Sequence, residues 1–181
     1  YCLVGPDISD GVIVSGRCDR GGVLEHWLLS EDGQWECASR FEDSEADFAG
    51  VAVGGQWIYV LDCKSQSIRR AKWLGSGGLS RVQLVDCWTA GDMPVLAQAT
   101  SLFLRWIPDG QLPDVDGDAL LLIRWWEQDH PVYCHLINLK LPSQYARSYV
   151  LGGDGDAGAG FVVADRKAVV GGSFTMAVVA S

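Results

Sequence analysis

The chain is short of positive charge. Its 181 residues include 14 lysines and arginines against 23 aspartates and glutamates, which gives a formal net charge of −9. Nucleic acids and anionic membrane surfaces are usually bound by basic patches, so we expect no nucleic-acid partner. Long hydrophobic runs are also missing. Stretches such as 119–123 are far too short to cross a bilayer, and we therefore expect no membrane insertion.

The sequence also lacks the short motifs of common catalytic and metal sites. It has no CxxC pair, no clustered cysteine and histidine, no GxSxG, no Walker loop and no dinucleotide fingerprint. The three histidines belong to no recognisable catalytic pattern: His26, His130 and His135. We therefore expect a protein that is not an enzyme and has no cofactor, apart from the calcium ion considered below.

Six cysteines are scattered at wide spacings, and without a CxxC or Cys/His cluster we expect no zinc site: Cys2, Cys18, Cys37, Cys63, Cys87 and Cys134. Most lie in strand-like segments, where a reduced thiol packs as a small hydrophobic group. We expect buried, reduced thiols, with disulfides as the alternative. The chain begins at Tyr1 without a methionine or a signal-like segment, and we interpret it as a processed product or a fragment of a longer chain. The sequence gives no localisation.

What the chain does contain is strand-forming sequence, most clearly between Phe48 and Gly75. Residues 57–61, WIYVL, are aromatic or mostly β-branched and are apolar on both faces of a strand. Such a run predicts a strand that is covered on both sides. A polar turn at 64–67 then leads into a second strand from 68 to 73. This stretch therefore predicts a β-hairpin.

Similar hairpins recur along the chain. Turns centred near Asp32, Ser65 and Asp129 are 33 and 64 residues apart, close to one and two steps of a single period. We divide the chain into approximate units 10–47, 48–92, 100–151 and 158–181, within a single all-β repeat domain, 1–181. The prediction is an all-β fold of repeated antiparallel hairpins that is β-propeller-like, either four-bladed or part of a larger propeller. A β-sandwich is the alternative.

One unit resembles a known family. Residues 51–73 contain WIYVLD, a polar turn and SIR, and they resemble a blade of the NHL and YWTD-type β-propellers. The matching residues are Ile58, Tyr59, Val60, Asp62, Ser67, Ile68 and Arg69. The other units depart from this pattern. The resemblance implies an architecture used mainly for binding, and it brings no catalytic residue with it.

One acidic loop has the pattern of a calcium site. The segment 114–118, DVDGD, is similar to the calcium loops of integrin-type propellers, because alternating carboxylates can meet at one hard cation. The candidate ligands are Asp114, Asp116 and Asp118. Ala119 replaces the expected glycine and Leu122 replaces a closing acidic ligand, so a solvated turn is the alternative. A second acidic segment, 42–47, is interpreted as a solvated connector.

Eight tryptophans are many for this length. We place Trp57, Trp73 and Trp106 in the core. The rings of Trp125 and Trp126 should point to opposite faces of one strand, which leaves one of them exposed as a candidate interaction site.

From these features we expect a non-enzymatic structural or protein–protein interaction module within a larger protein or assembly, for example a virion or phage-tail component. Its partners would be other protein subunits or other domains of the same chain. The alternative is a secreted carbohydrate-active or calcium-dependent propeller enzyme or lectin.

Overall fold

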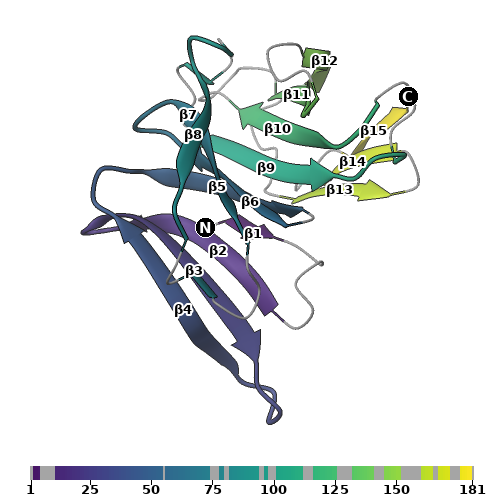
Figure 1. Ribbon diagram of the computed structural model, residues 1–181. Coiled ribbons are helices and arrows are strands. Elements are labelled where there is room, and N and C mark those ends of the chain that lie inside the picture. Colours follow the sequence, from purple (N-terminus) through teal and green to yellow (C-terminus); the bar gives the residue numbers. More distant parts are fainter. Residues whose placement is uncertain are drawn as a thin grey trace. The chain divides into compact units, whose positions relative to one another are not determined.

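The structure of the protein is a computed structural model. It describes residues 2–4, 11–54, 56–73, 78–79, 82–93, 96–97, 101–111, 116–125, 132–140, 145–151, 160–164, 167–171 and 176–180. The regular structure in this part of the chain consists of antiparallel strands (Figure 1). The predicted all-β class is therefore confirmed. The described residues include no helix long and apolar enough to span a bilayer.

The chain divides into two compact units, Tyr1–Gln98 and Ala99–Ser181. The first unit holds two four-stranded sheets. One sheet contains β1 (Cys2–Val4), β2 (Gly11–Cys18), β3 (Gly21–Leu29) and β4 (Trp35–Asp43). The other contains β5 (Phe48–Gly54), β6 (Trp57–Asp62), β7 (Ser67–Lys72) and β8 (Val85–Thr89).

The second unit also holds two sheets, one of four strands and one of three. One of its sheets contains β9 (Ser101–Ile107), β10 (Ala119–Trp125), β11 (Val132–Asn138) and β12 (Tyr145–Leu151). The other contains β13 (Gly160–Ala164), β14 (Lys167–Gly171) and β15 (Met176–Ala180). In all four sheets each strand pairs with its neighbours in the sequence. This up-and-down order is typical of propeller blades and differs from the Greek-key order of β-sandwiches.

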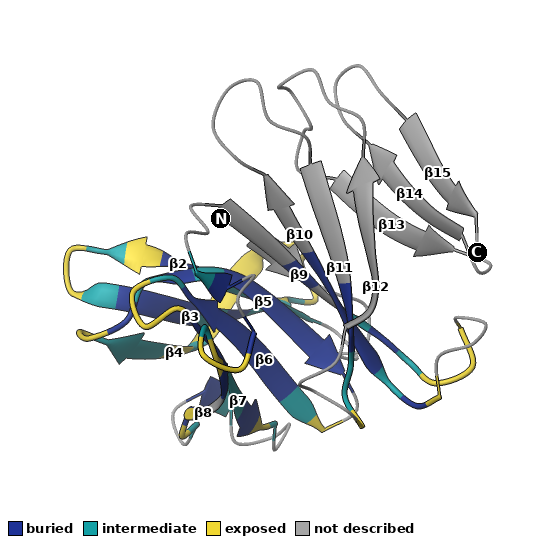
Figure 2. Ribbon diagram, turned by 90° about the horizontal axis from the view of Figure 1, so that it is seen from above, coloured by how far each residue is buried: buried dark blue, intermediate teal, exposed yellow. Residues whose placement is uncertain are grey.

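The hairpin at the centre of the first unit matches its sequence pattern. Strands β6 and β7 pair from Trp57 opposite Lys72 to Asp62 opposite Ser67. All residues of β6 after Trp57 are buried, as are six of the seven in β5, and both strands are dark blue in Figure 2. The prediction of a strand covered on both faces is therefore confirmed. Burial of each large apolar side chain contributes about 1.5–3 kcal/mol.

The two sheets of the first unit pack together through β5, which contacts β1, β2 and β3. Phe48 begins β5 and stacks on Phe41 of β4, with 6.4 Å between the ring centroids. The Phe48 ring also lies over Gly22 of β3, where an added Cβ would come within 2.7 Å of it. A glycine at this position therefore lets the ring approach the neighbouring sheet.

The acidic segment 42–47 is only partly the solvated connector that the sequence predicts. Glu42 and Asp43 are the last residues of β4, and Ala46 is buried. The carboxylate of Asp43 also forms a partly buried ion pair with Arg69. The interpretation was wrong for these residues because the strand continues two residues into the acidic run.

Candidate functional site

The tryptophan pair that the sequence singles out lies at the end of β10. Trp125 is the last residue of this strand and pairs with Ser101 of β9. Its side chain and all of Trp126 lie outside the described residues. The interaction site at Trp125 and Trp126 therefore stays a prediction.

The proposed calcium loop is built around hydrogen bonds and an ion pair. The backbone N–H of Asp109 donates to Asp118 Oδ1 at 3.0 Å, and Gly117 N–H donates to Asp109 Oδ1 at 2.9 Å. The carboxylate of Asp116 lies 2.7 Å from Lys140 Nζ. No group of three potential metal ligands occurs among the described residues, and Asp114 lies outside them. The calcium site at Asp114, Asp116 and Asp118 stays a prediction.

The carboxylate of Asp62, at the end of β6, is buried and accepts several hydrogen bonds. Its Oδ1 accepts the backbone N–H groups of Asp47 at 2.9 Å, Lys64 at 3.0 Å and Ser65 at 3.4 Å. Its Oδ2 lies 3.6 Å from Arg69 Nη1. One side chain therefore fixes both the turn after β6 and the connector before β5.

Arg69 extends this network to the other sheet of the unit. Its Nη1 donates to Asp43 Oδ2 at 2.8 Å, and this hydrogen bond lowers the pKa of Asp43. The guanidinium thus bridges a carboxylate at the end of β4 and one at the end of β6. Asp62 and Arg69 are among the residues that resemble a propeller blade, and both have a structural role here.

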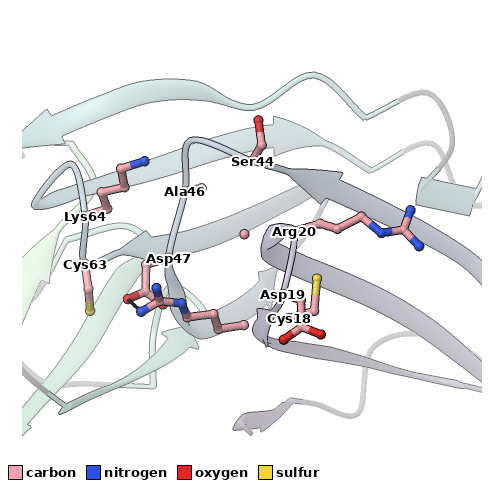
Figure 3. Close-up of a pocket in the computed structure, with 10 residues that line it drawn as sticks. Cys18, Asp19, Arg20, Ser44, Ala46, Asp47, Cys63 and Lys64 are labelled. Carbon is pink, nitrogen blue, oxygen red and sulfur yellow. Dashed lines mark hydrogen bonds and ion pairs between the residues drawn. The ribbon is translucent and has the colours of Figure 1, made fainter.

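A pocket of about 580 Å³ opens beside this network. Its lining comes from the β2–β3 turn, the β4–β5 connector and the β6–β7 turn, all within the first unit (Figure 3). Three cations line it: Arg17, Arg20 and Lys64. Each faces a carboxylate, at 3.3, 3.4 and 3.1 Å, and Figure 3 shows Lys64 at the left of the view and Arg20 at the right. No surplus charge converges on one point of the pocket.

The pocket also contains two free thiols, Cys18 and Cys63. Burial, with the charges of Asp47 and Asp62, raises the pKa of Cys63 to about 11. Because the thiolate is the nucleophilic form, this cysteine is poorly reactive near neutral pH. The pocket can therefore accept a small polar molecule, but its lining supplies no activated nucleophile at Cys63.

His26 lies in the core of the first unit. Its side chain is only 6% exposed, and its ring meets Trp73 edge-on with 5.0 Å between the centroids. Burial lowers the pKa of His26, and its Nε2 has no hydrogen-bond partner in the described structure. His26 therefore packs as a buried residue of the first unit.

Among the described residues, two of the three exposed large apolar side chains lie together at the outer end of the β3–β4 hairpin. The described pairing of β2 with β3 ends at Gly11 opposite Leu28, so the hairpin continues beyond β2 (Figure 1). Leu29 and Trp35 are cross-strand partners there, 49% and 51% exposed. We call residues 29–38 the hairpin arm. An exposed leucine and tryptophan side by side form a compact apolar surface on an otherwise polar hairpin.

The turn of the hairpin arm is well defined. Gly33 N–H donates to the Ser30 carbonyl at 2.9 Å, and Ser30 N–H donates to the Gln34 carbonyl at 2.8 Å. Gly33 has a φ of 80°, as expected for a three-residue turn that ends in a left-handed residue. The sequence predicted this turn, but not the exposure of the residues that flank it.

Several aromatic and cysteine residues differ from expectation. Trp57, Trp73 and Trp106 are half-buried rather than in the core. Trp57 begins its strand and is covered on one face by the Arg70 guanidinium, 4.6 Å from the ring centroid. Trp88 is the buried tryptophan of this unit and stacks on Tyr59. Cys18, Cys37 and Cys63 are free thiols but none is fully buried, and Cys37 is exposed.

Comparison with known proteins adds one structural likeness. No family model and no curated protein sequence matches the chain. Among solved structures, luciferin-regenerating enzyme is similar at a TM-score of 0.57 and 13% sequence identity. The match covers 89% of this chain and 50% of that one, so the chain spans half the length of the enzyme. Together with the up-and-down sheets, this likeness supports a propeller-like fold.

Proposed function

We propose that the protein is a non-enzymatic protein–protein interaction module of propeller type that binds its partner through the hairpin arm. The observation that carries this proposal is the exposed cross-strand pair of Leu29 and Trp35. Tryptophan is enriched at the energetic centres of protein interfaces, where its large ring is removed from water. Binding would bury a surface that folding of the first unit leaves in solvent.

The remainder of the first unit is consistent with a binding role. Its most buried carboxylate, Asp62, is engaged by backbone N–H groups, and His26 faces a tryptophan ring. Neither group is placed to transfer a proton to a substrate. The partner would be another protein subunit or another domain of the same chain.

The test compares complexes isolated from the natural source. The wild-type chain would be tagged and its native mass measured, beside a Leu29→Ser/Trp35→Ser variant. Both replaced side chains are about half exposed, so the substitutions should change stability by only about 0.5 kcal/mol each. A Val85→Ser variant is the matched control, because Val85 is similarly exposed but lies on β8.

We expect a stoichiometric partner with the wild type and the control, and its loss with the double variant. A wild-type chain that remains monomeric would contradict the proposal. Equal recovery of the partner with the double variant would also contradict it, because the hairpin arm would then have no part in binding.

The alternative function is a secreted carbohydrate-active or calcium-dependent propeller enzyme or lectin. The pocket beside Asp62 favours it, because hydroxyl, carboxylate and guanidinium groups in one cavity suit a polar small molecule. A calcium-dependent rise in melting temperature that EDTA reverses would support this function. A melting temperature indifferent to both would count against it.

A further inference from the structure

The outer edge of β4 is open along the hairpin arm. β4 is the last strand of its sheet, with β3 as its only neighbour in the described structure. Residues 35–38 are exposed on both faces, whereas Ser39 accepts a hydrogen bond from Leu79 N–H at 2.8 Å. The uninterrupted exposed run of β4 is therefore its first four residues. Such an edge is a template for pairing with another strand.

The register shows which backbone groups face outward on this edge. The Ser30–Gln34 hydrogen bond closes the hairpin, so Leu29–Trp35 is a non-hydrogen-bonded pair of the antiparallel ladder. Glu36 opposite Leu28 is then a hydrogen-bonded pair, and Cys37 opposite Trp27 is again non-hydrogen-bonded. The N–H and C=O groups of Trp35 and Cys37 consequently point away from β3. They are the groups to which an added strand would bond.

The charge along the same edge has one sign. Glu31, Asp32 and Glu36 lie on the hairpin arm, and there is no lysine or arginine between Arg20 and Arg40. Arg40 itself is occupied by Glu25 at 2.8 Å and Glu42 at 2.7 Å. Two copies paired through this edge would bring like charges together, which opposes self-association. A basic strand would complement it.

We propose that the occupant of this edge is an extended basic segment of a partner protein, which adds to β4 as a fifth strand. The inference rests on the proposed function and specifies the partner's chemistry. Strand addition supplies main-chain hydrogen bonds at Trp35 and Cys37, while side chains of alternate residues give specificity. Trp35 and Cys37 share one face and Glu36 lies on the other, so a segment that alternates apolar and basic residues fits both faces.

The probe is a fluorescein-labelled octapeptide of alternating valine and lysine, titrated into the full chain by fluorescence anisotropy. A second peptide carries N-methyl groups on alternate residues, so that one of its edges cannot donate hydrogen bonds; both phases of methylation are measured. A third replaces lysine with glutamate. The N-methylated peptide whose methyl groups face β4 should bind about tenfold or more weakly than the lysine peptide. The glutamate peptide should be weaker by a similar factor. Raising the salt concentration should weaken binding of the lysine peptide, because the charges are exposed.

Two protein variants locate the site. Cys37→Pro removes an outward-facing N–H without removing a bond to β3, and proline is tolerated on edge strands. We expect it to weaken the lysine peptide about tenfold. Glu36→Gln removes one carboxylate without altering the backbone, and we expect a loss of about threefold. Arg40→Gln, which lies beyond the first four residues of β4, is the control and should leave the affinity within about twofold.

Three results would overturn the inference: no binding of the lysine peptide, equal binding of both N-methylated peptides, or a wild-type chain that dimerises through β4. Each can occur while a Trp35-dependent partner is still recovered from the source. The proposed function would then stand without this choice of occupant. If the peptide binds but the wild-type chain has no native partner, or the Leu29→Ser/Trp35→Ser variant recovers the partner equally well, the proposed function is contradicted instead.

Discussion

Removal of the Asp62 carboxylate should destabilise the first unit more than removal of any exposed turn carboxylate. In Asp62→Ala the backbone N–H groups of Asp47 and Lys64 lose acceptors at 2.9 and 3.0 Å, and a third, longer bond from Ser65 is lost too. Arg69 loses its contact at 3.6 Å but keeps its bond to Asp43 at 2.8 Å, which limits the uncompensated charge.

The size of the effect follows from these contacts. A hydrogen bond to a charged group contributes about 1.5–3 kcal/mol, and the two short bonds dominate because the third is long. We expect Asp62→Ala to lower the free energy of unfolding by about 3–4 kcal/mol, a large part of the ~5–15 kcal/mol typical of a domain. Asp62→Asn keeps the Oδ1 acceptor and loses the charge, and should cost about 1–2 kcal/mol.

Urea unfolding followed by circular dichroism would measure the loss, and amide hydrogen exchange would locate it. Exchange at Asp47 and Lys64 should accelerate in the alanine variant and remain largely protected in the asparagine variant. Asp92→Ala is the matched control, because Asp92 accepts similar bonds from Thr89 at 2.9 and 3.0 Å but is exposed; its loss should be clearly smaller. The reasoning is refuted if both alanine variants cost the same, or if exchange at Asp47 is unchanged.

Three further predictions concern single side chains. Because burial lowers the pKa of His26, its contribution to stability is present above about pH 6.5 and is lost as the pH falls below this value. The free energy of unfolding should decline by at most about 1.4 kcal/mol per pH unit. In urea titrations at pH 5–7, His26→Leu should flatten this decline. Gln66 has a φ of 52° in the β6–β7 turn, so Gln66→Gly should raise the free energy of unfolding by about 0.5–1 kcal/mol. If thermal or urea unfolding shows a lower free energy of unfolding instead, the Gln66 side chain contributes more than its backbone conformation costs. With a pKa of about 11, the Cys63 thiol should be ionised in roughly one molecule in a thousand at pH 8. Mass spectrometry after iodoacetamide treatment should therefore find the exposed Cys37 modified before Cys63. Equal rates of modification for Cys37 and Cys63 would contradict the burial of Cys63.

The sequence predicts the fold well wherever a pattern is local. The run 57–61 and the turn after it identify β6 and β7 to within a residue, because β-branched residues and turn formers act over short distances. The Glu31-Asp32-Gly33 turn was found for the same reason. The run 102–107 has the pattern of a strand, and it forms β9, which pairs with β10 along its whole length.

Features that depend on the relative lengths and positions of strands could not be predicted. Trp35 and Trp57 each follow a Gly-Gln pair and begin a strand, yet Trp35 is exposed because its hairpin continues beyond the described pairing with β2. The role of Asp62 requires the N–H of Asp47, fifteen residues earlier, and the pocket combines three turns that are far apart in the sequence. Only the resemblance of residues 51–73 to a propeller blade indicated that Asp62 and Arg69 matter.

The exchange of bonds between the β4–β5 connector and the β6–β7 turn has a consequence for recombining such chains. Asp47 N–H donates to Asp62, and Cys63 N–H donates back to the Asp47 carbonyl at 2.8 Å. A genetic crossover placed between residues 47 and 48, the natural boundary between two sheets, would join a connector to a turn with which it did not evolve. The unit that can be transplanted intact therefore begins before Asp43 and ends after Arg69, out of phase with the sheets themselves.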